Sequence, residues 1–115
     1  MPSQGDIVLV PIPFTDLSST KRRPVIVISR DAYHQATTDM LVVAMTSNPA
    51  VTPYSFTITN ADLNSGQLNR PGQVRVDKIY TLSQTLAVRH FGRVNATILE
   101  RIRATLQDLT EIQST

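Results

Sequence analysis

The sequence predicts a small α+β domain that is mainly β, built on a sheet or partly open barrel and completed by one C-terminal helix. About five or six short segments are rich in β-branched and aromatic residues and are separated by polar or Pro-containing segments, as in small β-domains. Residues 98–109 instead carry an apolar stripe at helical spacing. The chain has 115 residues and no Cys, so we expect a single domain over 1–115 that folds without disulfides.

The first two strands are predicted on either side of a polar connection. Residues 7–13 form a β-rich run whose prolines lack a donor N–H and restrict its end to a sheet edge or bulge. Residues 15–22 are polar and are expected to connect the strands at the surface. Residues 24–29 are almost continuously apolar, which is typical of a strand covered on both faces.

The middle of the chain predicts two more strands. Asp31 is expected to cap a short helical turn that extends to residue 38. Residues 39–45 read as another buried strand. Residues 53–59 alternate apolar and polar side chains, which predicts a strand with one face in water.

The last third is predicted as a loop, two strands and a helix. Residues 60–72 are rich in Asn, Gly and Ser and are expected to form a loop. Residues 73–82 and 87–94 are expected to be strands, and the segment between them has no clear pattern. Thr97 and Glu100 resemble a capping box at the start of the helix.

One alternating stretch, residues 73–82, brings a base and a cation together. Val74 and Val76 should face the core, whereas Arg75 and Asp77 share the opposite face about 6.6 Å apart. An Arg beside an Asp on a sheet surface is usually only an ion pair, worth about 0–1 kcal/mol. The triplet alone therefore leaves a catalytic role open.

Composition excludes several classes of site. The two histidines, His34 and His90, are far apart in sequence, and without Cys no clustered metal ligands are present, so we expect no metal and no cofactor. Nucleotide-binding glycine motifs and the nucleophile motif of hydrolases are also missing. No signal peptide or long apolar run is seen, so we expect a cytoplasmic protein without a membrane segment.

The remaining polar groups suit RNA chemistry. The net charge is only +2, but residues 21–23 form a basic cluster that permits a polyanionic partner. Metal-free RNA cleavage by internal transfer needs a base for the 2′-hydroxyl, a cation for the phosphorane and a donor to the leaving oxygen. Arg23, Thr46, Arg75 and Asp77 could supply these groups, and Asp77 is chemically the better base because the pKa of Arg exceeds about 12.

Several blocks in sequence resemble the MazF/PemK family of toxin endoribonucleases. The order and spacing of the blocks match nearly throughout residues 5–109. They are Gly5-Asp-Ile-Val-Leu-Val10, Phe14-Thr15-Asp16, Lys21-Arg-Arg-Pro-Val-Ile-Val-Ile-Ser29, Thr46-Ser47 and Val74-Arg-Val-Asp-Lys-Ile79.

The resemblance implies an SH3-like (CcdB/MazF-type) small barrel of about five to seven strands with a C-terminal helix. It also implies a homodimer that cleaves single-stranded RNA without metal, and a cognate antitoxin whose extended tail occupies the RNA groove. The arginine that opens the second strand of the family falls on Arg23, its Thr-Ser on Thr46 and Ser47, and its Arg-x-Asp on Arg75 and Asp77.

These positions lead to a specific hypothesis. Asp77 takes the 2′-hydroxyl proton, Arg23 and Arg75 stabilise the phosphorane, and Thr46 bonds the scissile phosphate. For Asp77 to act as a base, Arg75 should point to the phosphate and not pair with Asp77. Members of the family differ in which pair they rely on, so the resemblance leaves acid and base open. Further RNA contacts are expected from Phe14, Thr15, Lys21, Arg22, Ser47 and Lys78.

The chain also departs from many relatives. Leu9 stands where a first-strand Trp is expected, and residues 15–22 contain no His, which leaves Arg23 as the donor or phosphate clamp. Two alternatives stay open: a poison that binds DNA gyrase as the CcdB toxins do, without needing Arg23, Arg75 or Asp77, and an inactive interaction module.

Overall fold

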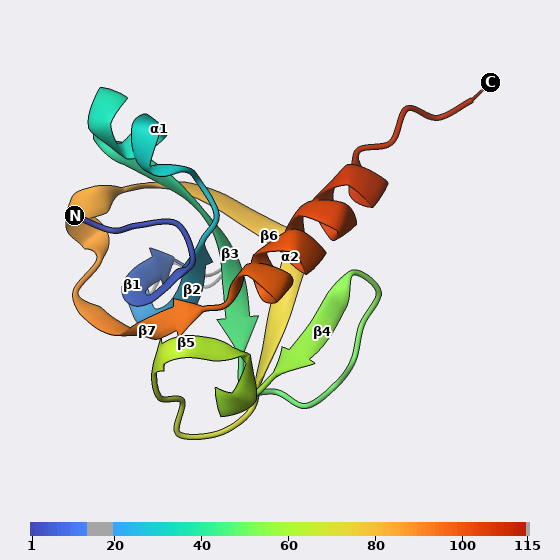
Figure 1. Ribbon diagram of the computed structural model, residues 1–115, viewed down its shortest axis with the longest axis horizontal. Coiled ribbons are helices and arrows are strands. Elements are labelled where there is room, and N and C mark those ends of the chain that lie inside the picture. Colours follow the sequence, from blue (N-terminus) through green and yellow to red (C-terminus); the bar gives the residue numbers. More distant parts are fainter. Residues whose placement is uncertain (14–19, 115) are drawn as a thin grey trace.

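The structure is a computed structural model that describes residues 1–13 and 20–114. Its strands form one curled antiparallel sheet in the order β4-β6-β3-β2-β1-β7-β5, and the C-terminal helix crosses it (Figure 1). The expected mainly β fold with a C-terminal helix is confirmed. The strands are β1 Asp6–Pro13, β2 Thr20–Val27, β3 Asp39–Thr46, β4 Ser55–Ile58, β5 Leu63–Gly66, β6 Gly72–Ser83 and β7 Arg89–Val94.

Two α-helices and two 3₁₀ turns complete the described part of the chain. They are α1 Asp31–Ala36, α2 Ala96–Leu109, η1 Asn60–Asp62 and η2 Gln84–Leu86. Within residues 1–13 and 20–114, no helix has the length and apolar character that crossing a bilayer requires.

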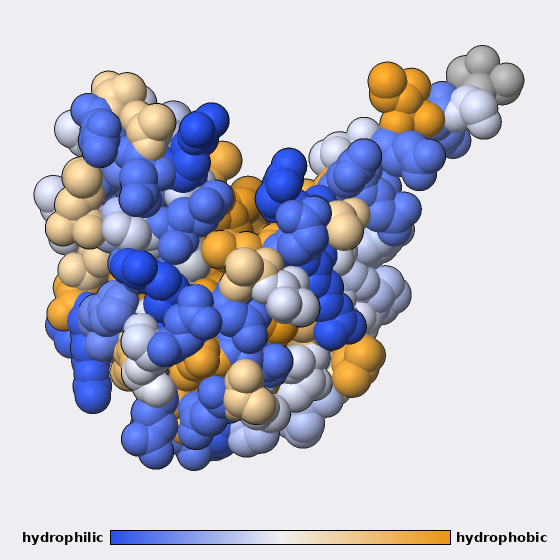
Figure 2. All heavy atoms as spheres, in the orientation of Figure 1, coloured by the Kyte–Doolittle hydropathy of each residue, from blue (hydrophilic) through white to orange (hydrophobic). Residues whose placement is uncertain are grey.

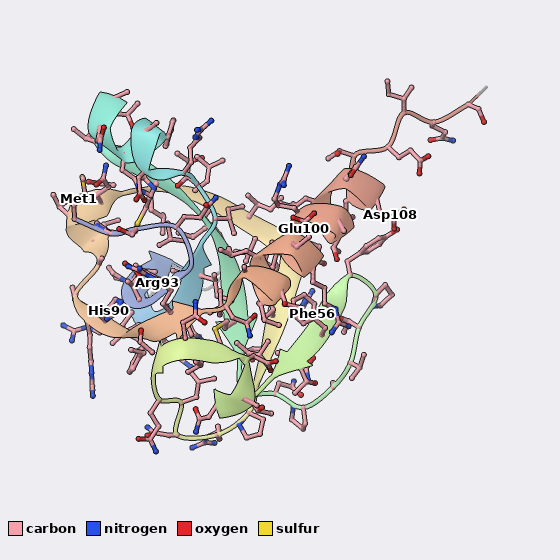
Figure 3. All side chains as sticks on the ribbon, in the orientation of Figure 1. Met1, Phe56, His90, Arg93, Glu100 and Asp108 are labelled. Atoms are coloured by element: carbon pink, nitrogen blue, oxygen red, sulfur yellow. The ribbon has the colours of Figure 1, made fainter. Side chains whose placement is uncertain are left out.

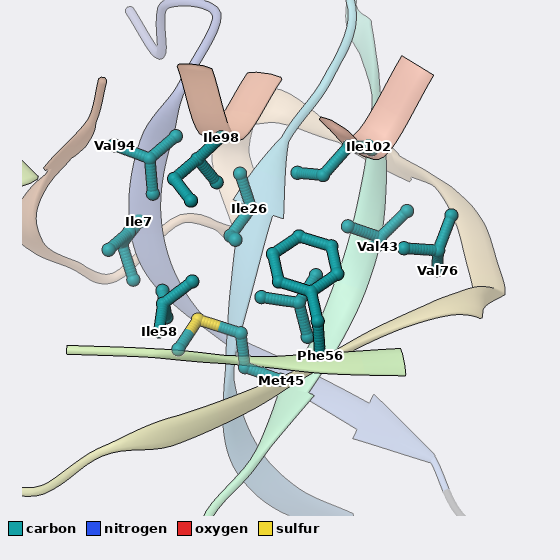
Figure 4. Close-up of a cluster of buried hydrophobic side chains, with 11 residues drawn as sticks. Ile7, Ile26, Val43, Met45, Phe56, Ile58, Val76, Val94, Ile98 and Ile102 are labelled. Carbon is teal, nitrogen blue, oxygen red and sulfur yellow. The ribbon is translucent and has the colours of Figure 1, made fainter. Parts of the chain in front are cut away.

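The main hydrophobic core lies between the sheet and α2 (Figure 4). Ile98 and Ile102 of α2 are buried there, and Leu99, Leu106 and Leu109 pack against the same cluster. The stripe predicted for the C-terminal helix is therefore confirmed. The strands contribute the buried side chains of Ile7, Ile26, Val43, Met45, Phe56, Ile58, Val74, Val76 and Val94.

A second core lies on the other face of β1, β2 and β3. Val25, Ile26 and Val27 are fully buried, because β2 has a core on each face, as its continuous apolar run predicted. The second core consists of Val8, Val10, Val25, Val27, Met40 and Val42, with Tyr80, Leu82 and Ala87 packed against it.

Two loop predictions are wrong in part. β2 already begins at Thr20, because the polar residues 20–23 pair with β1 through their backbones. Residues 60–72 contain η1 and β5, an edge strand that pairs with β7 alone among the described strands. Backbone pairing needs no apolar alternation, so composition did not reveal either segment.

The predicted helix caps also differ. Asp31 is the first residue of α1, and Arg30 occupies the N-cap position without a side-chain cap. Asn95 caps α2 by accepting a hydrogen bond from the Ile98 N–H at 3.0 Å, so Thr97 lies inside the helix. Asn is among the strongest N-cap residues, and it stands before the apolar stripe begins.

Candidate active site at the polar end of the sheet

A band of polar side chains crosses β2, β3, β6 and β4 on one face of the sheet. Val25, Ala44, Arg75 and Ser55 lie opposite one another across these strands. Directly opposed residues of antiparallel strands place their side chains on the same face. Val25 belongs to the second core. The polar band therefore lies on the same face of the sheet as the second core, next to the point where that core ends.

Arg23 and Thr46 lie at adjoining ends of β2 and β3. Arg23 is two residues before Val25 and Thr46 is two residues after Ala44, so strand alternation puts both on the face of the band. Both side chains are half-buried. The Thr46 Oγ1 accepts a hydrogen bond from the Asn48 N–H at 3.2 Å, where β3 turns away from the sheet.

A large bulge in β6 shapes the other side of the band. Val43 pairs with Ile79 and Ala44 with Arg75, so residues 76–78 of β6 have no partner on β3. The Val76 N–H instead donates to the Tyr54 carbonyl at 3.1 Å. Bulges commonly re-aim side chains beside active sites, and this one exposes residues 77–79.

Arg75 and Asp77 form a bidentate ion pair. The Arg75 Nε donates to Asp77 Oδ1 and its terminal nitrogen to Oδ2, both at 3.1 Å. These hydrogen bonds hold the pKa of Asp77 below its usual range and raise that of Arg75. The expectation that Arg75 would point away from Asp77 is therefore wrong in this structure, because the planar guanidinium finds a matching carboxylate two residues along its own strand.

Gln73 is a buried polar residue of the band that the sequence analysis missed. It lies opposite Thr46 on one side and Thr57 on the other. Its side-chain nitrogen donates to the Thr57 hydroxyl, and its side-chain oxygen is buried without a hydrogen-bond partner among the described residues. The alternation that placed Arg75 on this face also places Gln73 there, so the signal was present but was not used.

The side chains of both histidines make their polar contacts outside the polar band. The buried His34 side chain of α1 lies with Nε2 2.6 Å from the Ser29 hydroxyl. His90 of β7 lies with Nε2 3.2 Å from Asp6 Oδ1, and Arg93 Nε donates to the same oxygen at 2.9 Å (Figure 3). The described part of the chain contains no group of three or more His, Asp or Glu side chains that could hold a metal ion.

A comparison with protein families decides the identity of the chain. A model described as the PemK-like, MazF-like toxin of type II toxin–antitoxin systems matches residues 3–110. The chain belongs to this toxin family. This match confirms the resemblance of the PemK/MazF-like toxin to its family, which the blocks of its sequence indicated. No curated protein sequence matches it.

Solved structures share the fold of this PemK/MazF-like toxin. An endoribonuclease in complex with its cognate antitoxin from a mycobacterial species is 20% identical, with a TM-score of 0.76 and full coverage of both chains. A MazE–MazF structure from Deinococcus radiodurans is 25% identical, with a TM-score of 0.75 over 97% of this chain and 98% of that one. Another crystal form of that complex is 26% identical, with a TM-score of 0.72 and coverage of 96% and 97%.

The structure brings together only some of the residues expected to contact RNA in this PemK/MazF-like toxin. Phe14 and Thr15 lie outside the described residues. Lys21 is exposed and shares the face of Arg23, whereas the exposed Arg22 alternates to the opposite face. The other two, Ser47 beyond β3 and Lys78 in the bulge, are exposed next to the band.

Proposed function

We propose that this toxin is a metal-independent endoribonuclease that cuts single-stranded RNA at selected sequences, with the polar band as its active site. The observation that carries the proposal is the position of Arg23, Thr46 and the Arg75–Asp77 pair on one face of adjoining strands. This arrangement offers a base, two cations and a hydroxyl to one phosphate, and endoribonucleases of the same fold support it.

The Arg75–Asp77 pair is the resting form of the site in this mechanism. An RNA phosphate competes with Asp77 for the half-buried, planar Arg75 guanidinium, which binds phosphate as readily as carboxylate. When Arg75 turns to the phosphate, Asp77 loses the cation that lowers its pKa and becomes a stronger base. Substrate binding therefore prepares the base.

The chemical step is an internal transfer. The 2′-oxygen bonds to phosphorus while its proton passes to Asp77, and the bond from phosphorus to the 5′-oxygen breaks. The 5′-oxygen takes a proton from water, and the hydroxide so formed recovers the proton from Asp77. Arg23 and Arg75 stabilise the charge of the phosphorane, and the Thr46 hydroxyl donates to a non-bridging oxygen. The products carry a 2′,3′-cyclic phosphate and a 5′-hydroxyl.

We further propose that the toxin acts as a homodimer in the cytoplasm and is inhibited by a cognate antitoxin. Membership of a family of type II toxin–antitoxin toxins supports an antitoxin partner, as do the MazE–MazF structures of the same fold. The absence of Cys fits a reducing compartment.

The test is digestion of mixed-sequence RNA in EDTA, with the cut ends mapped. Arg23→Ala should lower kcat/KM by about 10²–10³-fold, because a preorganised charge at the phosphorane is lost. Lys21→Ala is the matched control on the same face of β2, and it should mainly reduce the salt dependence of binding. Asp77→Asn should abolish most cleavage, because an amide cannot take the proton.

Three outcomes would contradict the proposal: no cleavage of any RNA, cleavage that stops in EDTA, or wild-type rates for both Arg23→Ala and Asp77→Asn. If both variants still arrested growth on expression without cutting RNA, a binding poison such as one directed at gyrase would be the better explanation.

A further inference from the structure

The chain enters β4 through a tight turn, next to the bulge of β6. The Ser55 N–H donates to the Thr52 carbonyl at 3.2 Å, which closes a four-residue turn over residues 52–55. Pro53 occupies the second position of this turn and Tyr54 the third, where φ is +63°. A proline followed by a residue with positive φ is typical of a type II turn.

The backbone of Tyr54 is strained. Among the described residues it is the only one other than glycine with a positive φ, a conformation that a bulky side chain disfavours. The turn is nevertheless held firmly, because the Ser55 hydroxyl donates to the Thr52 carbonyl at 2.6 Å and the Thr52 N–H donates to the Ser55 Oγ at 3.0 Å. Backbone strain that is held in place in this way is often found at functional sites.

The turn determines where β6 loses its partner on the β4 side. Ser55 lies opposite Arg75, and the Tyr54 carbonyl then accepts the hydrogen bond from the Val76 N–H at 3.1 Å. The chain before Tyr54 belongs to the turn, and within the described part of the chain it forms no further backbone hydrogen bond with β6. The pairing of β4 with β6 therefore ends at Val76.

The bulge removes the pairing on the other side of β6. Residues 76–78 have no partner on β3, so Asp77 lies in a short, exposed segment that neither neighbouring strand holds. Arg75, in contrast, lies opposite a residue of β3 and a residue of β4. Segments with few backbone hydrogen bonds to their neighbours move most easily. The two members of the ion pair therefore differ in mobility, and Asp77 is the mobile one.

We propose that Tyr54 is a positioning residue, whose left-handed backbone leaves Asp77 free to separate from Arg75 when RNA binds. The inference rests on the proposed function, in which a phosphate takes the place of Asp77 on the Arg75 guanidinium, and it adds that the base moves while the cation stays in the sheet. The conformation of the Tyr54 backbone performs this role, because it ends the pairing at Val76. The Tyr54 ring is not required.

The experiment replaces Tyr54 by residues with opposite backbone preferences and measures RNA cleavage in EDTA. Gly and Asn adopt a positive φ readily, so Tyr54→Gly and Tyr54→Asn should cut RNA at close to the wild-type rate. Tyr54→Phe, the control that keeps a ring, should do the same. Val disfavours a positive φ and favours strands, so Tyr54→Val should extend β4 and hold Asp77 in the sheet. Its kcat and kcat/KM should fall together by about tenfold or more, because a contact of the transition state is lost.

A second measurement, amide hydrogen exchange, does not depend on catalysis. Alternate N–H groups of a strand face the same neighbour, so after Val76 the next N–H on the β4 side is that of Lys78. If Tyr54→Val extends β4, the Lys78 N–H gains an acceptor and should exchange about tenfold more slowly or less than in wild type. In Tyr54→Gly and Tyr54→Phe it should exchange as in wild type.

The outcomes separate this inference from the proposed function. If Tyr54→Val protects Lys78 but cuts RNA as wild type does, or leaves the exchange of Lys78 unchanged, the inference fails and the endoribonuclease stands. If Tyr54→Gly folds but cuts about tenfold more slowly or less, the ring is needed and the inference also fails, a result that decides the question even if Tyr54→Val does not fold. If wild type cuts no RNA, the proposed function fails and the inference fails with it.

Discussion

Asp77 owes its lowered pKa first to the hydrogen bonds from Arg75. Arg75→Ala removes this cation, so the pKa of Asp77 should rise to the ordinary Asp value of about 3.9 or above. NMR titration of the Asp77 carboxyl carbon in both proteins measures the change. Arg75→Lys retains a charge without the planar fork and should give an intermediate pKa. An unchanged pKa in Arg75→Ala would mean that the pair does not persist in solution.

Gln73 combines burial with an unpartnered side-chain oxygen among the described residues. Gln73→Met has similar shape and removes that oxygen, so the free energy of unfolding should stay constant or rise. If the amide contacts RNA, as its position opposite Thr46 suggests, kcat/KM should fall about tenfold. Denaturant unfolding and RNA cleavage measure the two effects separately.

Thr57→Val provides the contrast to Gln73→Met. It leaves the buried Gln73 amide nitrogen without its acceptor, which should cost about 1–3 kcal/mol of unfolding free energy. Equal losses of stability in Gln73→Met and Thr57→Val would show that Gln73 serves the fold and not the RNA.

At single positions, the sequence predicted the face of the sheet on which a side chain lies better than the group that the side chain contacts. Alternation correctly put Arg75 and Asp77 opposite the buried Val74 and Val76. It could not show that the Arg75 guanidinium turns along its own strand to Asp77, because spacing fixes the face of a side chain and not its rotamer. Gln73 was overlooked because its burial depends on β3 and β4, which flank it.

Among the elements, the strands with strong apolar patterns, the poorly periodic β7 and the stripe of α2 were predicted, whereas β5 was not. β5 has the sequence Leu-Asn-Ser-Gly and is mostly exposed, so only its pairing with β7 makes it a strand. The bulge of β6 was also unpredictable, because it arises where that strand leaves β3 and pairs with β4. Both features depend on neighbours distant in sequence.

β5 contacts β7 so closely that only glycine fits at the crossing. A Cβ on Gly66 would lie 2.0 Å from the Phe91 carbonyl oxygen, and Gly66 has a φ of +82°. Gly66→Ala should therefore separate β5 from β7 and cost about 1–3 kcal/mol of unfolding free energy. Hydrogen exchange should accelerate over residues 63–68. Ser65→Ala, which keeps the backbone and changes an exposed side chain, should exchange as wild type does.

The contacts that join Asp6 of β1 to Arg93 and His90 of β7 could not be predicted from the sequence either. Asp6 in β1 accepts hydrogen bonds from the Ser3 N–H at 2.8 Å and from Arg93 of β7 at 2.9 Å, with His90 at 3.2 Å. Burial alone would raise the pKa of Asp6, but these partners outweigh it and the pKa is lowered. Asp6 and Arg93 are 87 positions apart in sequence, so only the topology brings them together.

This cluster should make the stability of the whole molecule depend on pH. Since the pKa of Asp6 is lower in the folded state, its contribution is complete above the unfolded pKa of about 3.9 and is lost as the pH falls through the folded pKa. Asp6→Asn should cost about 1–3 kcal/mol at pH 7 and flatten the acid side of the stability curve. Urea unfolding from pH 2.5 to 7 measures this.

Asp108→Asn, on the exposed side of α2, is the control and should follow the wild-type curve. A wild-type curve for Asp6→Asn would contradict a stabilising role of the cluster. Arg93 and His90 project from β7 toward β1 (Figure 3).

Figure 2 shows a mixed polar and apolar surface, with a hollow between α1 and α2. A pocket beside α2 is lined by Ile28, Leu99 and Ile102 among other residues. This pocket is lined by residues other than those of the polar band, so variants there should not alter the chemistry proposed for Arg23 and Asp77.

The attachment of β5 has a consequence for engineering. The cations and the carboxylate of the band stand on β2 and β6, whereas residues 67–71 form a short loop that follows the edge strand β5. A library randomised over residues 67–71, with Gly66 and Gly92 kept, would vary this loop and leave the groups proposed to cut RNA in place. The loop beside β5 is therefore the segment of this scaffold in which new surface chemistry can be introduced at the lowest cost to the polar band.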